Sequence, residues 1–380
     1  MPPQTNEKEQ RELVSVIVPA YNGERVIEES IESVLSQTYT PIELIIIDDA
    51  SKDGTYARIR KYENDDRAAI FKAVKHDENK GLAATLNDGI KKSQGKFIVI
   101  LHQDCVLIGN DWIFKGLKYL LDDPRVAVVT GYYGIPPKKL TFTPKAFGVL
   151  RRQYHAANPK RMDEEVTFSE GKCDIYRKEI LEKIGGFPER FRIAGEDLYV
   201  SYKTRQLGYS IVKSYKLPVL QKFGLAADNV PKNLKKEFIF GEAMGGIFPM
   251  FRTFLFKKMS TSEYSRTRSL QRATQPLFVF CFIFLLLLAA AFHSLLILYL
   301  ASAMLVARYL FYVITIRSEL RRMTSVLHED ATSPFLEALV IAALGIVIDF
   351  VYALGFGYGL VSYLIGRYPD KLSARTMGGQ

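Results

Sequence analysis

Several short apolar runs in the first part of the chain are each followed at once by polar residues that could bind a phosphorylated ligand. These polar sequences are PAYNGE (19–24), DDASKDGT (48–55), HDENKG (76–81) and HQD (102–104). Carboxylates such as Asp48 and Asp49 can accept hydrogen bonds from a base N–H or from ribose hydroxyls. Asp104 offers the hard oxygen ligand of a Mg²⁺ or Mn²⁺ ion that bridges a diphosphate. Together, these residue types are typical of a nucleotide-sugar site.

Ordinary structural roles are open to the same residues. Asp53 or Ser51 could cap the helix that follows, and the Asp48-Asp49 pair could do the same. Asp104 could be a turn residue. The case for binding therefore depends on whether these residues come together at one place in the fold.

The elements that must position these residues are strands alternating with helices. Apolar, β-rich runs predict strands at 13–18, 42–47, 69–74 and 97–101, and helical spacing follows at 26–36, 55–62 and 82–92. This alternation indicates an α/β fold with a mostly parallel, Rossmann-like sheet. Such sheets bind ligands at the carboxyl ends of their strands, so we expect the polar sequences to share one edge.

A second group of polar residues lies between 168 and 209. Gly171 falls in a predicted loop, and Glu196 and Asp197 open a predicted helix. An acidic residue at a helix N-terminus can do no more than interact favourably with the helix dipole, and that alternative stays open here.

The region between the two groups predicts a helix at 112–121 and a strand at 126–130. The basic segment 134–160 follows, and we expect it to be irregular because prolines, including Pro144, interrupt it. A long irregular segment is either a lid or acceptor-binding loop, or a simple surface loop.

The composition of the C-terminal part predicts membrane helices. The 380 residues are 48% hydrophobic, and segments 276–316 and 335–366 contain almost no charge. Each exceeds the roughly 20 residues that a helix needs to span a bilayer. The first segment has room for two helices with a turn near His293 and Ser294, and the second for one helix or a short hairpin about 355–359. The sequence therefore predicts three or four spans.

Other features of this part agree with a membrane location. Segment 231–275 mixes phenylalanines with basic residues, which suits interfacial helices, or alternatively packing against the first domain. Asp349 is costly in lipid, so it should face another helix, and it could mark a groove for a lipid acceptor. No signal peptide precedes the first predicted strand, so we expect the α/β domain to remain in the cytoplasm and the protein in the cell membrane.

The charge pattern argues against a nucleic-acid-binding protein, and the cysteine spacing argues against a cysteine metal site. The formal charge of +10 comes from basic residues that are interleaved with acids, apart from a cluster before residue 276 that suits anionic lipid, so nucleic acid is not an expected partner. Cys105, Cys173 and Cys281 have no metal-ligand spacing and are expected to be free thiols.

The predicted organisation has five parts, from a soluble α/β domain to a helical membrane domain. They are a polar tail (1–12), the α/β domain (13–230), interfacial amphipathic helices (231–275), three or four transmembrane helices (276–366) and a second polar tail (367–380).

The chain resembles the family-2 glycosyltransferases, which have the GT-A fold. The resemblance rests on VSVIVPAYNGE, IELIIIDDASKDGT, HDENKGLAATLNDGIKKSQGKFIVILHQD and IAGEDLYVSYKTRQLGYSIV, in the family's order, and covers about residues 13–225. It implies a metal-binding Asp104 and a general base at Glu196-Asp197, most directly Asp197. The predicted residues of the nucleotide-sugar site are Pro19, Tyr21, Glu24, Asp48, Asp49, Asn79, Gly81, Asn87, Gln103, Asp104 and Gly171.

The chain departs from the family pattern at two positions. The usual Asp-x-Asp reads His102-Gln103-Asp104, and His102 could contact the metal directly, act through water, or only pack. The family often has a histidine about twenty residues after the acidic pair, where Gln221 could stand in as a weaker oxygen donor. Mg²⁺ or Mn²⁺ is the expected cofactor, with Asp104, His102 and Gln221 as its candidate ligands.

The acidic pair favours a particular acceptor. A hydroxyl acceptor needs a base because its pKa lies far above 7, whereas a phosphate acceptor is already an anion. The sequence therefore predicts a membrane-bound inverting glycosyltransferase acting on a lipid-linked or membrane-presented hydroxyl. The alternatives are a polyprenyl-phosphate sugar synthase and a non-catalytic protein that binds nucleotide-sugar.

Overall fold

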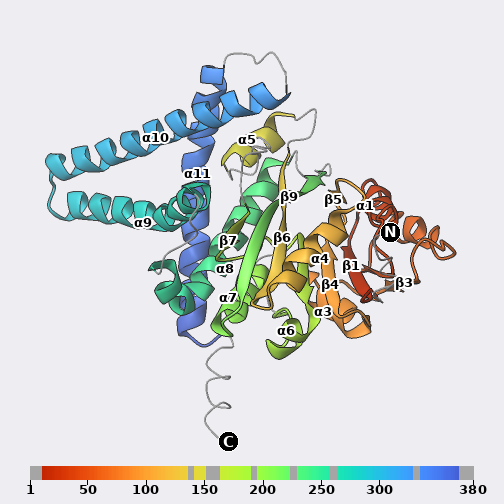
Figure 1. Cartoon of the computed structure of the whole chain (residues 1–380). Coiled ribbons are helices and arrows are strands. Elements are labelled where there is room, and N and C mark those ends of the chain that lie inside the picture. Colours follow the sequence, from red (N-terminus) through yellow and green to blue (C-terminus); the bar gives the residue numbers. More distant parts are fainter. Residues whose placement is uncertain are drawn as a thin grey trace, which may run out of the picture. The chain divides into compact units, whose positions relative to one another are not determined.

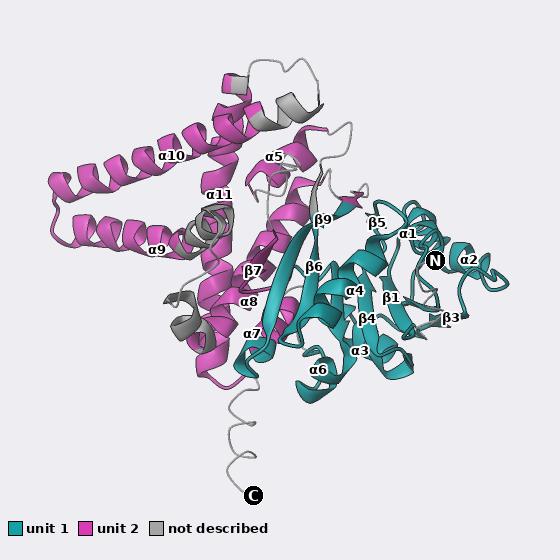
Figure 2. Cartoon of the chain, in the orientation of Figure 1, with its two compact units in different colours: residues 1–132, 169–192, 203–219 teal, residues 133–168, 193–202, 220–380 magenta. Residues whose placement is uncertain are grey.

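The computed structural model describes residues 11–135, 141–150, 163–189, 195–222, 229–256, 263–327 and 334–367. Most of the two predicted tails and much of segment 134–160 lie outside these residues. The chain divides into two compact units, shown in Figure 2. The first contains residues 1–132, 169–192 and 203–219, and the second contains residues 133–168, 193–202 and 220–380.

The first unit is built on parallel strands that agree with the predicted ones. They are β1 (Val14–Ala20), β2 (Ile42–Asp48), β3 (Ile70–Lys75) and β4 (Phe97–Leu101), in the spatial order β3-β2-β1-β4. Every residue of β1, β2 and β4 is buried, as expected for parallel strands covered on both faces. Because Ala20 pairs with Asp48 and Asp48 with Lys75, these strands end at the same edge.

Helices connect these strands and cover the sheet. They are α1 (Ile27–Leu35), α2 (Thr55–Arg60), α3 (Leu82–Lys92) and α4 (Trp112–Asp122). Their apolar residues recur at helical spacing: α1 buries Ile27, Ile31, Val34 and Leu35, and α4 buries Trp112, Ile113, Leu117 and Leu120. The edge that carries the polar loops is therefore held by a rigid core.

The sheet continues beyond β4 with five further strands, of which only β6 was predicted, at 126–130. Among the described residues its order runs β3-β2-β1-β4-β8-β6-β9-β5, and β7 pairs with β9. The added strands are β5 (Cys105–Leu107), β6 (Val126–Ile135), β7 (Glu164–Val166), β8 (Cys173–Arg177) and β9 (Ser210–Gln221). β8 runs antiparallel to β4 and β6, with Phe97 opposite Arg177. The sheet is thus mixed, with its parallel part at the N-terminal end of the chain.

Two short helices complete this part of the chain. α6 (Lys178–Lys183) follows β8 directly, and α7 (Glu196–Gln206) begins at the predicted acidic pair. Cys105 and Cys173 are buried and Cys281 is exposed, and all are free thiols as expected.

Segment 134–160 is not wholly irregular, contrary to the expectation. It contains α5 (Phe142–Leu150), whose Ala146, Phe147 and Leu150 are buried. Pro144 does not break this helix because it lies in the first turn, where its missing N–H has no intrahelical partner. Phe147 and Leu150 belong to one apolar cluster of the second unit with Tyr312 and Ile341.

The second unit contains the long helices, and Figure 1 shows α9 and α10 as a hairpin. The helices are α8 (Val230–Phe256), α9 (Glu263–Ala291), α10 (Leu295–Leu327) and α11 (Pro334–Leu364). Within the described residues, three stretches are long and apolar enough to cross a membrane: Thr274–Ala291, Leu295–Arg321 and Phe335–Leu364. The predicted turn lies at His293, whose φ is 46°. α11 is continuous through 355–359, so no second hairpin forms there.

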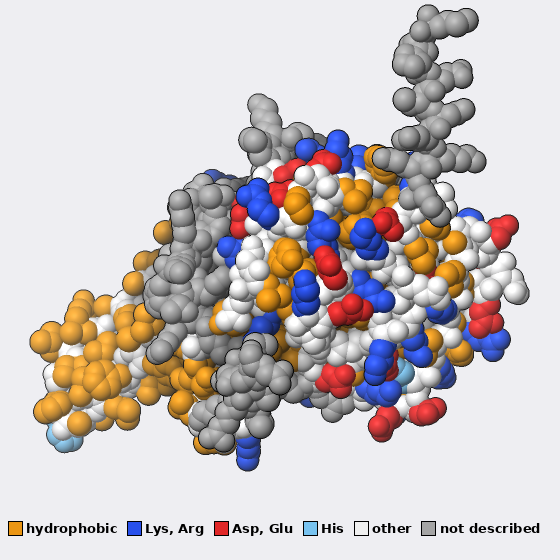
Figure 3. Space-filling view, turned by 60° about the horizontal axis from the view of Figure 1, so that its bottom comes forward, with side chains coloured by type: hydrophobic (Ala, Val, Ile, Leu, Met, Phe, Trp, Pro, Cys, Tyr) orange, Lys and Arg blue, Asp and Glu red, His pale blue; other side chains and the backbone are white. Residues whose placement is uncertain are grey.

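Hydrophobic side chains gather in one region of the face seen in Figure 3, whereas acidic and basic side chains alternate in another. Leu287, Phe292, Leu295 and Tyr299, at the end of the α9–α10 hairpin, are between 64% and 82% exposed. A contiguous apolar surface of this kind suits lipid contact.

The predicted interfacial segment 231–275 contains α8 and the first part of α9, and α8 packs closely on α11. A Cβ atom on Gly241 or Gly245 of α8 would lie 2.1 or 1.9 Å from a carbonyl oxygen of α11. Gly355 and Gly359 of α11 stand in the same relation to α8, at 2.0 and 1.9 Å. Small residues four apart on both helices allow the two backbones to touch, a packing mode common among membrane helices.

Asp349 faces another helix, as predicted. It is fully buried, and its carboxylate accepts hydrogen bonds from Arg308 Nε at 2.8 Å and from Tyr312 Oη at 2.6 Å. Arg308 also lies over the ring of Phe278, 5.3 Å from its centroid. Because Asp349 is enclosed by these side chains, it does not line an open acceptor groove. It joins α11 to α10.

Candidate functional site

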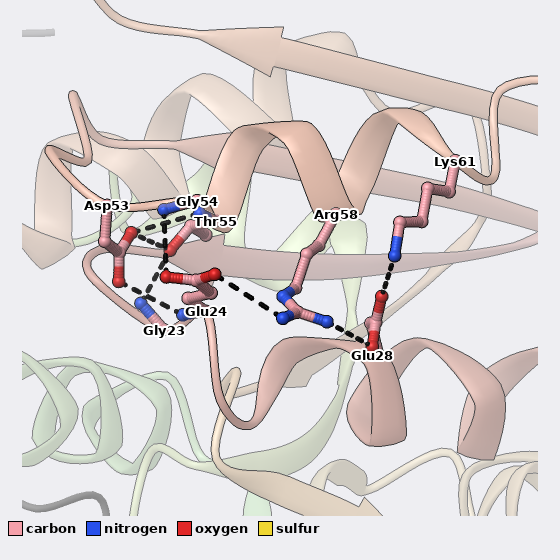
Figure 4. Close-up of polar contacts among 8 residues, drawn as sticks. All are labelled: Gly23, Glu24, Glu28, Asp53, Gly54, Thr55, Arg58 and Lys61. Atoms are coloured by element: carbon pink, nitrogen blue, oxygen red, sulfur yellow. Dashed lines mark hydrogen bonds and ion pairs between the residues drawn. The ribbon is translucent and has the colours of Figure 1, made fainter.

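The loops after β1 and β2 are tied together at the common edge of the sheet. Gly23 N donates to Thr55 Oγ1 at 2.8 Å, Glu24 N donates to Asp53 Oδ2 at 3.2 Å, and Gly54 N donates to Glu24 Oε2 at 3.2 Å (Figure 4). Asp53 also accepts a hydrogen bond from Thr55 N, the first residue of α2, but the N-cap position of this helix is Gly54 and not Asp53. These bonds make the two loops one rigid wall.

The Glu24 side chain is bonded to the neighbouring loop and helix and does not project freely. Besides accepting from Gly54 N, its carboxylate lies 3.4 Å from Arg58, which also contacts Glu28 at 2.9 Å (Figure 4). Lys61 completes the group at 2.8 Å from Glu28. Glu24 is therefore placed to shape the pocket predicted around it through the backbone of the neighbouring loop.

Tyr21 and Gln103 join the loop after β1 to the end of β4. Tyr21 N donates to Gln103 Oε1 at 3.0 Å, and Gln103 Nε2 donates to Tyr21 O at 2.9 Å. The amide of Gln103 is thus occupied by main-chain groups, while the Tyr21 side chain is 43% exposed. Of this pair, Tyr21 is the one that presents a side chain at the edge. Pro19 is buried within β1.

The two adjacent aspartates after β2 have different surroundings. Asp48 is fully buried, its Oδ2 accepts from Ser51 N at 3.2 Å, and its Oδ1 has no hydrogen-bond partner among the described residues. Asp49 Oδ1 accepts from Lys80 N at 2.8 Å, and its Oδ2 accepts from Gly81 N at 2.9 Å. Asp49 thereby connects the ends of β2 and β3.

The loop after β3 is organised around Asp49. Asn79 Nδ2 donates to the main-chain oxygen of Asp49 at 3.3 Å, and His76 Nδ1 lies 2.8 Å from Asp49 Oδ1. Gly81 has a φ of 90°, a conformation that a side chain would strain, and it begins α3. His76 lies in one of the quoted sequence motifs, but spacing alone gave it no role.

The side chain of Asn87 is hydrogen-bonded to a segment about 100 residues away in the chain. Its Nδ2 donates to Phe187 O at 2.7 Å and its Oδ1 accepts from Phe187 N at 2.8 Å. A further bond reaches Glu189 at 3.1 Å. Asn87 therefore shapes the site through the turn at 185–189, and its amide is used there.

The end of β4 brings His102 beside the loop at Gly171. His102 N donates to Lys172 O at 2.9 Å, and the imidazole forms a hydrogen bond to the main chain of Gly171. Burial lowers the pKa of His102 to about 4, with Asp104 opposing this shift and Lys172 adding to it. The ring is therefore neutral at physiological pH.

These residues fit a divalent cation in part. His102 Nε2 is a buried atom with no hydrogen-bond partner among the described residues, and a neutral imidazole nitrogen is a metal ligand. Asp104, two residues away, supplies a carboxylate. The described residues contain no group of three or more His, Cys, Asp or Glu side chains that could hold a metal. A cation here would therefore need oxygens from its ligand and from water to complete its coordination.

The predicted catalytic pair lies in the second unit, at the start of α7. Glu196 is 6% exposed, and burial together with the charge of Asp197 raises its pKa to about 8. Asp197 Oδ1 accepts from Leu198 N at 2.8 Å. Glu196 therefore keeps its proton near neutral pH. Gln221 is the last residue of β9, also in the second unit.

Comparisons with known proteins agree on one family. Residues 15–185 match the family described as Glycosyl transferase family 2. An O-antigen chain rhamnosyltransferase of Salmonella typhimurium is 29% identical over 206 residues, which cover 52% of this chain and 62% of that protein. A glycosyltransferase of Haloferax volcanii is 27% identical over 208 residues, 52% of this chain and 63% of that protein. The chain thus spans less than two thirds of either relative.

A solved structure is also similar. It is a mannosyltransferase from Pyrobaculum calidifontis in complex with GDP-Man and Mn²⁺, with 19% identity and a TM-score of 0.49 over 96% of this chain and 89% of that one. The family match covers residues 15–185, which contain the strand-end motifs and all the strands of the mixed sheet from β2 to β8. This part of the chain is a Glycosyl transferase family 2 domain.

Proposed function

We propose that this protein is a membrane-bound inverting glycosyltransferase that moves a sugar from a nucleotide-sugar donor to a lipid-linked or membrane-presented hydroxyl. The observation that carries the proposal is the Glu196-Asp197 pair, in which burial keeps a proton on Glu196 beside Asp197. A base of this kind is needed for a hydroxyl acceptor and has little use with a phosphate acceptor.

In this mechanism Asp197 takes the proton of the acceptor hydroxyl. The acceptor oxygen attacks the anomeric carbon from the face opposite the nucleoside diphosphate, whose bond to the sugar breaks as the new bond forms. A single displacement of this type inverts the anomeric configuration. The neutral Glu196 beside Asp197 can donate a hydrogen bond without competing for the same proton.

The edge of the first unit is the proposed donor site. Asp49 and the loop at 79–81 would accept the nucleoside, with Tyr21 exposed beside them. Asp104 and His102 would hold a Mg²⁺ or Mn²⁺ ion. Such an ion, when bound, neutralises the charge that develops on the departing diphosphate. The carboxylate and the neutral imidazole are the features of this chain that suit it.

The long apolar helices support a membrane-presented acceptor. Three stretches of the described chain can cross a bilayer. Such helices would keep the catalytic domain at the membrane surface, where lipid-linked acceptors are found. We propose that this domain faces the cytoplasm, where nucleotide-sugars are made, and that α8, which packs on α11, lies at the membrane boundary.

The test is release of nucleoside diphosphate by the detergent-purified full chain. Nucleotide-sugars with uridine, guanosine and thymidine would be supplied with extracted membrane lipids, in Mn²⁺ or in EDTA. Asp197→Asn should lower turnover by roughly 10²–10⁴-fold without weakening donor binding, because it removes only the base. Glu165→Gln, at an acidic residue of β7 outside the pair, is the matched control and should leave turnover unchanged.

Each other outcome points to a different function. Turnover that survives in Asp197→Asn and requires a lipid phosphate would identify a polyprenyl-phosphate sugar synthase. Donor binding without release of nucleoside diphosphate, across all lipids tried, would identify a non-catalytic binding protein. Retention of the anomeric configuration in the product would contradict the single displacement.

A further inference from the structure

We infer that His76 is a positioning residue of the donor site, and that its positively charged form holds Asp49 and the 76–81 loop in the shape that binds the nucleotide. The inference rests on the proposed donor site and extends it to a residue for which the sequence gave no role. It also predicts how nucleotide binding changes with pH.

The geometry around His76 is that of a clamp between two elements. Its Nδ1 lies 2.8 Å from Oδ1 of Asp49, at the end of β2, and its Nε2 lies 3.0 Å from Oδ2 of Asp88, on α3. The ring is buried, with 5% of the side chain exposed, and Asp49 is buried with it. The imidazole therefore spans the space between the second strand and the helix that follows the third.

Both ring nitrogens of His76 face carboxylate oxygens, and this requires two N–H donors. A neutral imidazole has one N–H, and its other nitrogen would direct a lone pair at a carboxylate. Asp88 is ionised at neutral pH: partial burial raises its pKa, but Lys80 and His76 outweigh this and hold its pKa below the usual value. The arrangement is thus complete only with an imidazolium.

The clamp acts on the loop through Asp49. The same Asp49 oxygen that meets His76 accepts from Lys80 N at 2.8 Å, and the other oxygen accepts from Gly81 N at 2.9 Å. His76 N also donates to Asp48 O at 2.8 Å, which fixes the start of the loop. The orientation of the Asp49 carboxylate therefore sets the path of the backbone into α3.

Loss of the positive charge on His76 would weaken these hydrogen bonds, so nucleotide affinity would fall. In the described chain, the ionisable groups in contact with the clamp are Asp49 from β2, Asp88 from α3 and Lys80, which lies 3.3 Å from Asp88. When the ring loses a proton, one carboxylate loses its donor and faces a lone pair. Nucleotide affinity should therefore be highest in the acidic part of the working range and fall as the pH rises.

The experiment is calorimetric titration of the full chain in detergent with UDP, GDP and dTDP in the presence of Mn²⁺. As the pH is raised from about 5.5 to about 8.5, the wild type should lose roughly tenfold in affinity. His76→Asn keeps a donor toward Asp49 but cannot be charged, so its binding should be weaker and independent of pH. Comparison of variants with wild type cancels the titration of the nucleotide itself.

A second variant separates charge from folding. Asp88→Asn keeps the shape but removes the carboxylate that favours the imidazolium, so the fall in affinity should move to lower pH. Asp66→Asn, at an exposed residue between α2 and β3 and outside the loop, carries the same change of charge and should reproduce the wild-type profile. A purely structural histidine would change the melting temperature without moving these profiles.

The results that overturn the inference are distinct from those that overturn the proposed function. Tight nucleotide binding with the same pH profile in wild type and in His76→Asn would remove the role of His76 and leave the donor site standing. Failure of the wild type to bind any of the nucleotides at any pH would remove the donor site, and the inference with it.

Discussion

Two buried nitrogen-bearing side chains of this protein, His76 and Arg308, both contact carboxylates but have different surroundings. His76 lies between Asp49 and Asp88, and the side chain of Asp88 is 32% exposed, so that cluster reaches solvent and is open. Arg308 is 10% exposed beside the fully buried Asp349 and the face of an aromatic ring. The first cluster is joined to a loop at the sheet edge. The second is sealed, and its effect is to fix which helix faces meet.

The comparison predicts that disrupting the sealed cluster of Arg308, Tyr312 and Asp349 has the largest effect on stability. Asp349→Leu should cost about 3–5 kcal/mol, because it leaves the Arg308 guanidinium buried without its partner. Thermal unfolding in detergent would measure this. The double variant with Arg308→Met should recover most of the loss, since the pair can be replaced by apolar groups of similar volume. If the double variant is as unstable as Asp349→Leu, the ion pair itself stabilises the fold, and apolar groups cannot replace it.

Disrupting the open cluster of His76, Asp49 and Asp88 should have a smaller effect, and this effect should appear as weaker nucleotide binding at the donor site. In Asp49→Asn the amide nitrogen must face an N–H donor, either from Gly81 or from His76 and Lys80. Loss of charge-assisted hydrogen bonds costs roughly 1.5–3 kcal/mol each, so we expect at least tenfold weaker nucleotide binding. Calorimetry measures the binding, and thermal unfolding the stability. Unchanged affinity would contradict the assignment of Asp49.

Glu196 sharpens the comparison, because it is a buried carboxylate that keeps its proton instead of meeting a cation. Its pKa is raised from 4.5 to about 8, so the folded state binds the proton more tightly than the unfolded state. The resulting stability is complete below the unfolded pKa and is lost as the pH rises toward 8. Glu196→Gln should therefore melt like wild type near pH 5 and at a higher temperature near pH 9. Equal melting at both pH values would contradict the buried, protonated state.

The smallest effect is expected at the solvent side of the open cluster. Lys80 is 45% exposed and lies 3.3 Å from Asp88. Lys80→Ala should change the unfolding free energy by about 0–1 kcal/mol, less in high salt, because water screens the pair. Denaturant titration at low and high salt would show this. A loss as large as that of Asp49→Asn would mean that the cluster is not open.

The parts of the fold that could be predicted are those with local signals. β1 to β4 follow continuous apolar runs, and a turn motif marks each end, so their positions agree within a few residues. β8 and β9 were missed because their pairing joins residues far apart in the chain: β8 lies against β4. α5 was missed because Pro144 indicates a break unless the start of the helix is known.

The candidate site shows the same division. The spacing of motifs predicted which loops come together at the sheet edge, but not which side chains are already used there. Gln103 is bonded to Tyr21, Asn87 to Phe187, and Asp48 is enclosed, and each of these facts depends on a partner far away in sequence. His76 was overlooked because a single histidine in a loop gives no signal until its two carboxylates are seen.

The tight turn between α9 and α10 has a consequence for how the protein can be reached. With this hairpin across a bilayer, the chain between the two helices presents only 292–294 to the far compartment. A three-residue connection offers almost nothing for an antibody, a protease or a membrane-impermeant label to attack there. Recognition of a head group on that side by this hairpin would have to come from a turn that contains one phenylalanine, one histidine and one serine.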